Sequence, residues 1–360
     1  MSFSFGFTKD DFSDDELDES SHIQPTVPST TQTQPNKGDY LESLTILDEN
    51  LPKKHSLDSI LDTLKDVRLT FDNYTTTGQN IIYRRELFDV KHQIMMEADN
   101  QNSKLSELLI DENNNDLQKN VYEGGFKSWE CAYDTVDKLS QLIDQGKLTS
   151  SSILEFGCGT ALPSCFILMK KIQSKNTDPL RLTLSDFNFD VLRLVTLPNI
   201  LIHWASTLPV EQLHSLTTTE NDQRFSNDEL SLTPALIEQF KKDLRQYNIE
   251  LSFISGSWGK QFNEIISGDN VDLIISSETI YSPESLPIVA ESIKQILTNS
   301  NADSSLAIVA AKNIYFGVGG SLVEFLNYFN QIKSAEFTVT VEEVNDAQLK
   351  RSLVYINYSS

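Results

Sequence analysis

Residues 153–160 read Ile-Leu-Glu-Phe-Gly-Cys-Gly-Thr, and this stretch decides the fold of the chain. An apolar strand ends in an acid and a turn with two glycines, and a helical pattern follows from Ala161 to Lys171. Gly157 and Gly159 lack a Cβ, so they can adopt a positive φ and let a ligand come close to the backbone. The carboxylate of Glu155 would repel a pyrophosphate. The loop therefore suits a ligand with positive charge, such as an amino group or a sulfonium, and an ordinary tight turn is the alternative.

The same loop lacks the signatures of two nucleotide-binding motifs. A dinucleotide fingerprint needs Gly-x-Gly-x-x-Gly, but Leu162 stands where the third glycine belongs. The chain also has no Gly-Lys-Ser/Thr of a phosphate-binding loop. A Rossmann dehydrogenase is therefore a distant alternative.

Downstream of Tyr122, strand patterns alternate with helical patterns. The predicted strands are residues 152–156, 181–185, 250–255, 271–276, 305–311, 336–342 and 352–358. Helical patterns separate the first five, which predicts a doubly wound, mostly parallel sheet with helices on both faces. The last two indicate an antiparallel hairpin. The predicted fold class is α/β, with a seven-stranded, mostly parallel sheet that ends in this hairpin.

The chain divides into three predicted regions. Residues 1–38 are acidic and rich in Pro, Ser, Thr and Gln, which is typical of a mostly disordered tail. Residues 39–118 form a partly ordered extension, with a helical pattern at 57–64 and a strand pattern at 81–90. Residues 119–360 carry the sheet.

Composition limits the classes of function. A formal net charge of −23 argues against a general nucleic-acid binder, which would show a basic face. Three cysteines without paired spacing fit a reducing compartment and no structural zinc, and the scattered histidines predict no metal site. The sequence shows neither a secretory pattern nor an apolar run of membrane-span length. We expect a soluble monomer in the cytoplasm, with the nucleus as a second location.

Ligands of a doubly wound sheet bind at the carboxyl ends of the strands. Three further strand ends carry compatible groups: Asp186-Phe187-Asn188, Gly256-Ser257-Trp258 and Ser277-Glu278-Thr279-Ile280-Tyr281. An acid after the second strand can accept hydrogen bonds from both hydroxyls of a ribose, and an indole can frame an adenine. Each group also has a structural alternative: Asp186 as a helix cap, Trp258 as a packing aromatic and Glu278 as a solvated acid.

These residues together resemble a known family. The acid-x-Gly-x-Gly turn, the acid after strand two and the terminal hairpin resemble the seven-stranded S-adenosylmethionine-dependent methyltransferases. The match narrows to the histidine protein methyltransferase family on five segments: Trp129-Glu130-Cys131, Ser185-Asp186-Phe187-Asn188, Val195-Thr196-Leu197-Pro198-Asn199, Ser277-Glu278-Thr279-Ile280-Tyr281 and Tyr315-Phe316-Gly317-Val318-Gly319-Gly320. Ala161 departs from the glycine that many methyltransferases have, and we expect only a slightly tighter turn there.

The resemblance implies a methyl transfer from S-adenosylmethionine to a ring nitrogen of a protein histidine. It makes residues 119–360 the methyltransferase domain, and it implies a large-subunit ribosomal protein as the substrate. It assigns the cofactor to Trp129, Glu130, Cys131, Glu155, Gly157, Gly159, Asp186, Phe187, Asn188, Gly256, Ser257, Trp258 and Ser277. Glu278 and Tyr281 are expected to face the acceptor as catalytic residues.

The acceptor imidazole needs the correct tautomer and orientation rather than a strong base. An imidazole with a pKa near 6.5 is mostly neutral at pH 7, but only the ring nitrogen without a proton can attack. Glu278 can accept the other N–H and fix the tautomer, and Tyr281 can stack on the ring or bond to it. No metal is required.

Two alternatives stay open on the sequence. A lysine methyltransferase of the same fold would share the Glu-x-x-Tyr motif. A non-catalytic factor that binds a basic ribosomal protein would use the acidic charge equally well. The acidic charge otherwise serves solubility alone.

Overall fold

The computed structural model describes residues 38–98, 124–218, 226–302, 304–344 and 349–359. These residues belong to one compact unit, residues 36–360. The predicted disordered tail, apart from its last residue, lies outside the described residues. The division into tail, extension and methyltransferase domain stays a prediction.

The main sheet has the predicted architecture and one additional strand. Its order is β1-β7-β5-β4-β8-β9-β11-β10. The strands are β1 (Lys53–His55), β4 (Ser152–Phe156), β5 (Leu180–Asp186), β7 (Ile249–Ser255), β8 (Leu273–Ser277), β9 (Ser304–Lys312), β10 (Phe337–Glu343) and β11 (Arg351–Ser359). Strands β7, β5, β4, β8 and β9 are parallel, and β10 and β11 form the antiparallel hairpin. The mostly parallel sheet is confirmed, and β1 from the N-terminal extension adds an antiparallel edge strand.

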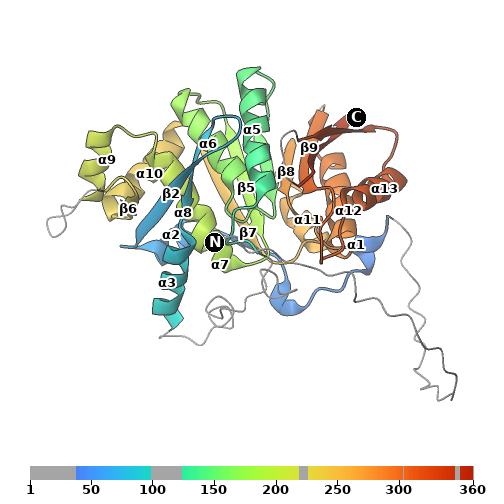
Figure 1. The fold of residues 1–360 in the computed structure, drawn as a ribbon, viewed down its shortest axis with the longest axis horizontal. Coiled ribbons are helices and arrows are strands. Elements are labelled where there is room, and N and C mark those ends of the chain that lie inside the picture. Colours follow the sequence, from blue (N-terminus) through green and yellow to red (C-terminus); the bar gives the residue numbers. More distant parts are fainter. Residues whose placement is uncertain (1–37, 99–123, 219–225, 303, 345–348, 360) are drawn as a thin grey trace, which may run out of the picture. The chain divides into compact units, whose positions relative to one another are not determined.

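Helices cover both faces of this sheet. One core holds residues of α5 (Glu130–Asp144), α6 (Leu162–Gln173), α8 (Leu197–Ala205) and α10 (Pro234–Gln246). A second core holds residues of α11 (Lys260–Ile266), α12 (Ser285–Thr298) and α13 (Leu322–Ile332). Successive strand residues point to opposite faces, so Ile153 joins the first core and Leu154 the second. Figure 1 shows α5 and α6 in green and α12 and α13 in orange to red. None of the helices within the described ranges is long and apolar enough to cross a membrane.

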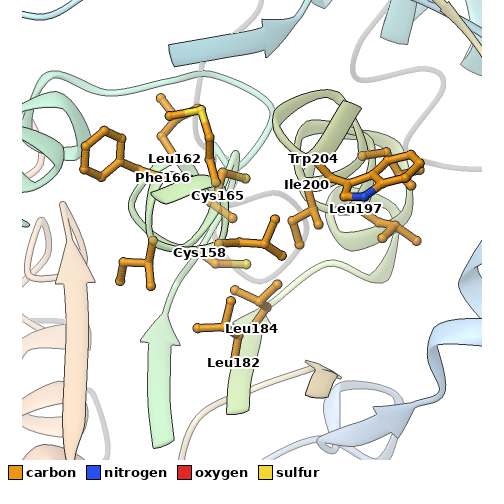
Figure 2. Close-up of a cluster of buried hydrophobic side chains, with 14 of the residues drawn as sticks. Cys158, Leu162, Cys165, Phe166, Leu182, Leu184, Leu197, Ile200 and Trp204 are labelled. Atoms are coloured by element: carbon orange, nitrogen blue, oxygen red, sulfur yellow. The ribbon is translucent and has the colours of Figure 1, made fainter. Parts of the chain in front are cut away.

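The first core supports the glycine turn. Cys158 lies between the two glycines, and its side chain points into the apolar cluster of Leu162, Leu184 and Ile200 (Figure 2). Its neighbours Gly157 and Gly159 have no side chains, so one side of the turn is bare backbone. The other side packs into the core through the side chain of Cys158.

A small second sheet joins two segments that are distant in sequence. It consists of β2 (Arg68–Thr75), β3 (Ile81–Arg85) and β6 (Glu229–Ser231), in the order β3-β2-β6. The strand predicted at 81–90 ends early, because α3 (Leu87–Ala98) begins there. The guanidinium of Arg85 donates to Asp89 at 2.7 Å and to Gln93 at 2.7 Å. A helix explains both contacts, because it places residues four and eight positions ahead on the same face as Arg85.

The helical stretch that follows β5 contains a π-helical segment. It consists of α7 (Phe189–Val191), the π segment Leu192–Thr196, and α8. Pro198 has no N–H to donate to the carbonyl of Leu194. The guanidinium of Arg85 donates to that carbonyl instead, at 2.7 Å.

Candidate functional site

A cavity of about 1200 Å³ lies at the carboxyl ends of the central parallel strands. Most of the predicted site residues lie on its wall: Trp129, Glu155, Gly157, Gly159, Asp186, Phe187, Gly256, Ser257, Trp258, Ser277, Glu278 and Tyr281. Glu130, Cys131 and Asn188 are not among its lining residues. Cys131 and Asn188 contact two residues that do line it, Glu278 and Asp186. Glu130 pairs with Lys312, which in turn lies beside Glu278.

The glycine turn allows close approach from the cavity. Gly157 has φ +68°, and a Cβ there would lie 2.7 Å from Cγ2 of Thr279. Ala161 at the start of α6 has φ +52°, a left-handed conformation that an alanine rarely adopts. The departure from glycine is therefore larger than the slightly tighter turn expected from the sequence.

Two acids stabilise the glycine turn and the start of the helix after it: Glu155 in β4, and Asp186 at the end of β5. Asp186 accepts from the N–H of Gly159 at 2.9 Å and from the N–H of Asn188 at 3.1 Å. Glu155 accepts from the N–H of Ser164, in the first turn of α6, at 3.0 Å. Burial raises the pKa of Glu155 to about 7, and its hydrogen bonds with Ser164 oppose that rise. Asp186 bonds to the N–H of Asn188, which is the residue before α7, and caps no helix, so the alternative of a helix cap is wrong. The ligand roles of Asp186 and Glu155 stay predictions.

Two buried residues support the turn from the π-helical segment and α8. Thr196 donates to the carbonyl of Gly159 at 2.6 Å, and Asn199 donates to the carbonyl of Thr160 at 2.8 Å. Asn199 also accepts from the backbone N–H of Arg85 in β3, at 2.8 Å. Thr196 and Asn199 belong to the segment 195–199 that resembles the histidine protein methyltransferase family, but the sequence indicated no role for either residue.

The wall formed by residues 256–258 combines a ring with a closely packed backbone. The indole of Trp258 stacks on Phe156 with ring centroids 4.2 Å apart. Its buried Nε1 has no hydrogen-bond acceptor among the described residues. Gly256 has φ +109°, and a Cβ there would meet the backbone of Leu51 at 2.7 Å.

Glu278, also on the cavity wall, belongs to a charged cluster. Its side chain is 7% exposed, and Nζ of Lys312 lies 3.7 Å from its Oε1. The same ammonium lies 3.0 Å from Oε2 of Glu130 and 5.3 Å from the ring centre of Trp129. Burial alone would lower the pKa of Lys312, but Glu278 and Glu130 outweigh it and raise that pKa. Lys312 is therefore a cation at neutral pH.

Cys131 and Tyr315 lie behind this cluster as neutral groups. The N–H of Cys131 makes a long hydrogen bond of 3.5 Å to Oε1 of Glu278. Burial, followed by the nearby charge of Glu278, raises the pKa of the Cys131 thiol and of the Tyr315 phenol well above their ordinary values. Neither group is ionised at neutral pH. Tyr315 begins the glycine-rich segment that resembles the family, and Lys312 precedes it by three residues. The resemblance implies that residues 312–320 form part of the rim for the acceptor, and it implies no contact between Lys312 and Glu278.

The loop that contains Tyr281 is fixed by close packing. The N–H of Gly320 donates to the carbonyl of Tyr281 at 2.9 Å. A Cβ at Gly320 would lie 2.4 Å from the carbonyl oxygen of Ile280. Phe316 and Val318 of the same glycine-rich segment line the cavity mouth and are 76% and 40% exposed.

The chemistry of the cavity fits S-adenosylmethionine. The cofactor is a cation at sulfur with an ammonium, a ribose diol and an aromatic base. The wall provides two buried carboxylates, glycine backbone without side chains in the way, and an indole.

Comparison with known proteins identifies close relatives. Histidine protein methyltransferase 1 of Saccharomyces cerevisiae is 43% identical over an alignment of 378 positions, gaps included, which covers 99% of this chain and 98% of that protein. Histidine protein methyltransferase 1 of Schizosaccharomyces pombe is 35% identical over 83% of this chain and 84% of that protein. The histidine protein methyltransferase 1 homolog of Rattus norvegicus is 27% identical over 68% of this chain and 59% of that protein.

Other comparisons add little. No protein-family model matches the chain. Among solved structures, a magnesium protoporphyrin IX methyltransferase from Synechocystis covers 76% of this chain and 94% of its own at 10% identity and a TM-score of 0.36, too low a score to support an inference.

The alignment with the Saccharomyces cerevisiae protein covers nearly the whole chain, and the alignment with the Schizosaccharomyces pombe protein covers most of it. They decide among the alternatives that the sequence left open, because the relatives carry a name for transfer to histidine. The chain belongs to the histidine protein methyltransferase family, and it is an S-adenosylmethionine-dependent protein-histidine N-methyltransferase.

Proposed function

We propose that this enzyme methylates a histidine in a basic large-subunit ribosomal protein, with Glu278 and Tyr281 aiming the imidazole. The observation that carries the second part is the position of Glu278. Its carboxylate lies on the wall of the same cavity as the Gly157 to Gly159 turn. An acceptor ring beside Glu278 would therefore share the cavity with the methyl donor.

The cofactor would be held by the residues assigned from the sequence. Gly157 and Gly159 leave room for its methionine part, and Asp186 is placed to accept from the ribose hydroxyls. Trp258 frames the base, with Gly256 and Ser257 beside it. Glu130, Cys131 and Asn188 act indirectly: Glu130 through Lys312, Cys131 through Glu278, and Asn188 through Asp186.

When bound, S-adenosylmethionine supplies an electrophilic methyl group on a cationic sulfur. Glu278 accepts the N–H of the acceptor imidazole, which leaves the lone pair on the other ring nitrogen for attack. Its carboxylate then stabilises the cation that forms on the ring. Tyr281 restricts the ring from a second side. Such positioning contributes roughly 7–11 kcal/mol at best, so a strong protein base is unnecessary.

The mouth of the cavity offers a surface for the rest of the substrate. Phe316 and Val318 present exposed apolar side chains next to the space where the histidine would enter. The contacts of Tyr315 and Gly320 fix both ends of that short segment. The segment would pack on the residues that flank the acceptor histidine.

The charge of the chain supports a basic partner. With 52 acidic and 29 basic residues, the enzyme attracts a cationic protein over long range. We propose that the enzyme acts as a monomer in the cytoplasm, with the nucleus as a second location, and that it recognises protein rather than nucleic acid.

The substrate is tested by supplying candidate proteins side by side. The enzyme is incubated with methyl-labelled S-adenosylmethionine and with separated proteins of the large and of the small ribosomal subunit. We expect label in a basic large-subunit protein, none in small-subunit proteins, and none with Asp186→Ala. Label that depends on Asp186 but appears only in proteins outside the large subunit would overturn the ribosomal assignment.

A further inference from the structure

The cavity has one wall that does not come from the sheet domain. Six of its lining residues belong to the N-terminal extension: Tyr40, Leu44, Thr45, Ile46, Leu47 and Asn50. They lie in residues 38–55, a segment that contains α1 (Tyr40–Ser43), the 3₁₀ turn Asp48–Asn50 and β1. We propose that this segment, here called the strap, closes the cofactor cavity, and that Glu291 is the positioning residue that holds it there.

One end of the strap is fastened to a buried carboxylate. Glu291 on α12 is 5% exposed, and Figure 1 shows the blue α1 beside α12. Its Oε1 accepts from the N–H groups of Gly38 and Tyr40, and its Oε2 accepts from the N–H of Leu41, each at 3.1 Å. The phenol of Tyr328 donates to Oε1 at 2.5 Å.

This arrangement makes Glu291 depend on the strap. A buried carboxylate is costly unless donors surround it, and three of these four donors are backbone groups of the strap. Two of them, the N–H groups of Tyr40 and Leu41, belong to the first turn of α1 and therefore lack partners within the helix. Undocking the strap would remove three of the four donors of the Glu291 carboxylate, so this contact, here called the latch, favours the docked strap.

The other end of the strap is fastened to the proposed cofactor wall itself. β1 pairs with β7 from Lys53 opposite Ser255 to His55 opposite Phe253. The N–H of Ser257 donates to the carbonyl of Asn50 at 2.8 Å. A Cβ on Gly256 would lie 2.7 Å from the carbonyl oxygen of Leu51, so only glycine permits this contact.

Between its two ends the strap is held weakly. Leu47 is 61% exposed, and Ile46 touches the backbone at Gly259, where a Cβ would lie 3.1 Å from its Cδ1. The nearby pair of Lys260 and Glu42 is solvent-exposed and contributes little. The latch at Glu291 therefore determines whether this middle part stays on the cavity.

The proposal rests on the placement of the cofactor in this cavity, and it is tested with S-adenosylhomocysteine as the probe. Glu291→Gln keeps the size of the side chain but loses the charge and turns one acceptor into a donor. We expect the variant to bind the probe about tenfold more weakly, as for the loss of one charge-assisted hydrogen bond, mainly through faster dissociation. Calorimetry gives the affinity, and stopped-flow tryptophan fluorescence gives the dissociation rate.

Three controls make the result specific. Lys260→Met removes only the exposed pair and is expected to leave both quantities unchanged. Ile46→Ala shortens a side chain of the strap and leaves Glu291 unchanged, and we expect about threefold weaker binding of the probe. This variant tests the strap independently of any effect that Glu291→Gln has on folding. Bound probe is expected to slow proteolysis within residues 38–55 of the natural chain and to protect Glu291→Gln much less.

The outcomes separate the two claims. Unchanged probe affinity and dissociation in both Glu291→Gln and Ile46→Ala, with binding lost in Asp186→Ala, would overturn the strap and keep the cofactor site. Unchanged binding in Asp186→Ala as well would overturn the placement of the cofactor and the strap with it.

Discussion

The ammonium of Lys312 at the end of β9 lies 3.7 Å from the carboxylate of Glu278 at the end of β8. The two strands are parallel neighbours, so their ends meet at the same edge of the sheet. Glu278 has φ +60°, which is uncommon for a residue with a side chain and is found where surrounding contacts determine the backbone. The acid proposed to aim the substrate is thus held by a strained backbone and by a half-buried cation.

Replacing Glu278 with Gln is expected to reduce turnover while cofactor binding stays normal. The amide cannot supply the negative charge that stabilises the methylated ring, so we expect a loss of about 10²-fold in turnover. S-adenosylhomocysteine affinity, measured by calorimetry, is expected to stay within about threefold. A Glu278→Gln enzyme that no longer binds the cofactor product would show that the residue has been assigned to the wrong ligand.

Lys312→Met tests whether the ion pair positions Glu278. The substitution removes the cation near Glu278, Glu130 and the ring of Trp129, and we expect turnover to fall about tenfold. Lys138→Met is the matched control, because Lys138 pairs with Glu342 at 2.7 Å on the surface, outside the cavity lining. Equal turnover in the two variants would mean that the Lys312 pair has no part in catalysis.

Gly320→Ala tests how the loop before Tyr281 is fixed. The added Cβ would lie 2.4 Å from the backbone at Ile280, so the loop must shift. We expect the free energy of unfolding to fall by about 1–3 kcal/mol, as for overpacking, and turnover to fall with little change in cofactor affinity. Gly268→Ala is the control, because a Cβ there meets nothing within 4 Å. A Gly320→Ala enzyme with normal turnover and denaturant midpoint would contradict the packing.

Glu155→Gln is expected to change how stability depends on pH. The pKa of Glu155 is raised from 4.5 to about 7 in the folded chain. The folded state therefore holds a proton that the unfolded state has lost, and stability from this group falls as pH rises from about 4.5 to about 7. The difference in unfolding free energy between Glu155→Gln and the natural chain should thus shift in favour of Gln by up to about 3 kcal/mol across this range.

The comparison must be made between the two chains at each pH. His203 is buried with its pKa lowered to about 4 by desolvation, so its contribution to stability rises with pH between about 4 and 6.5 and opposes that of Glu155. Urea unfolding at pH 5, 6 and 7.5 measures the difference. A difference that stays constant across these values would show that Glu155 is ionised throughout.

The sequence predicted the sheet because each central strand is a short apolar run bounded by turns. The patterns at 152–156 and 250–255 correspond to β4 and β7 within one residue. It also located the cavity, because carboxyl ends of parallel strands meet at one edge. It did not predict where the strand beginning at Ile81 ends, because Arg85, Asp89 and Gln93 are spaced four residues apart. A spacing of four puts residues on one face of a helix, and as an even number it also puts them on one face of a strand.

The contacts that the sequence did not predict join residues over long sequence distances. Lys312 and Glu130 are 182 positions apart, and no local pattern joins them. Likewise, nothing in residues 38–55 indicates a docking partner, because Glu291 binds backbone N–H groups that every residue except proline possesses.

The most direct test of the central claim is the identity of the methylated amino acid. Large-subunit ribosomal proteins are labelled with methyl-labelled S-adenosylmethionine, hydrolysed in acid, and separated against methylhistidine and methyllysine standards. The account predicts label in methylhistidine that disappears with Asp186→Ala and falls steeply with Glu278→Gln. Label in methyllysine, or label in methylhistidine that persists in Asp186→Ala, would contradict it.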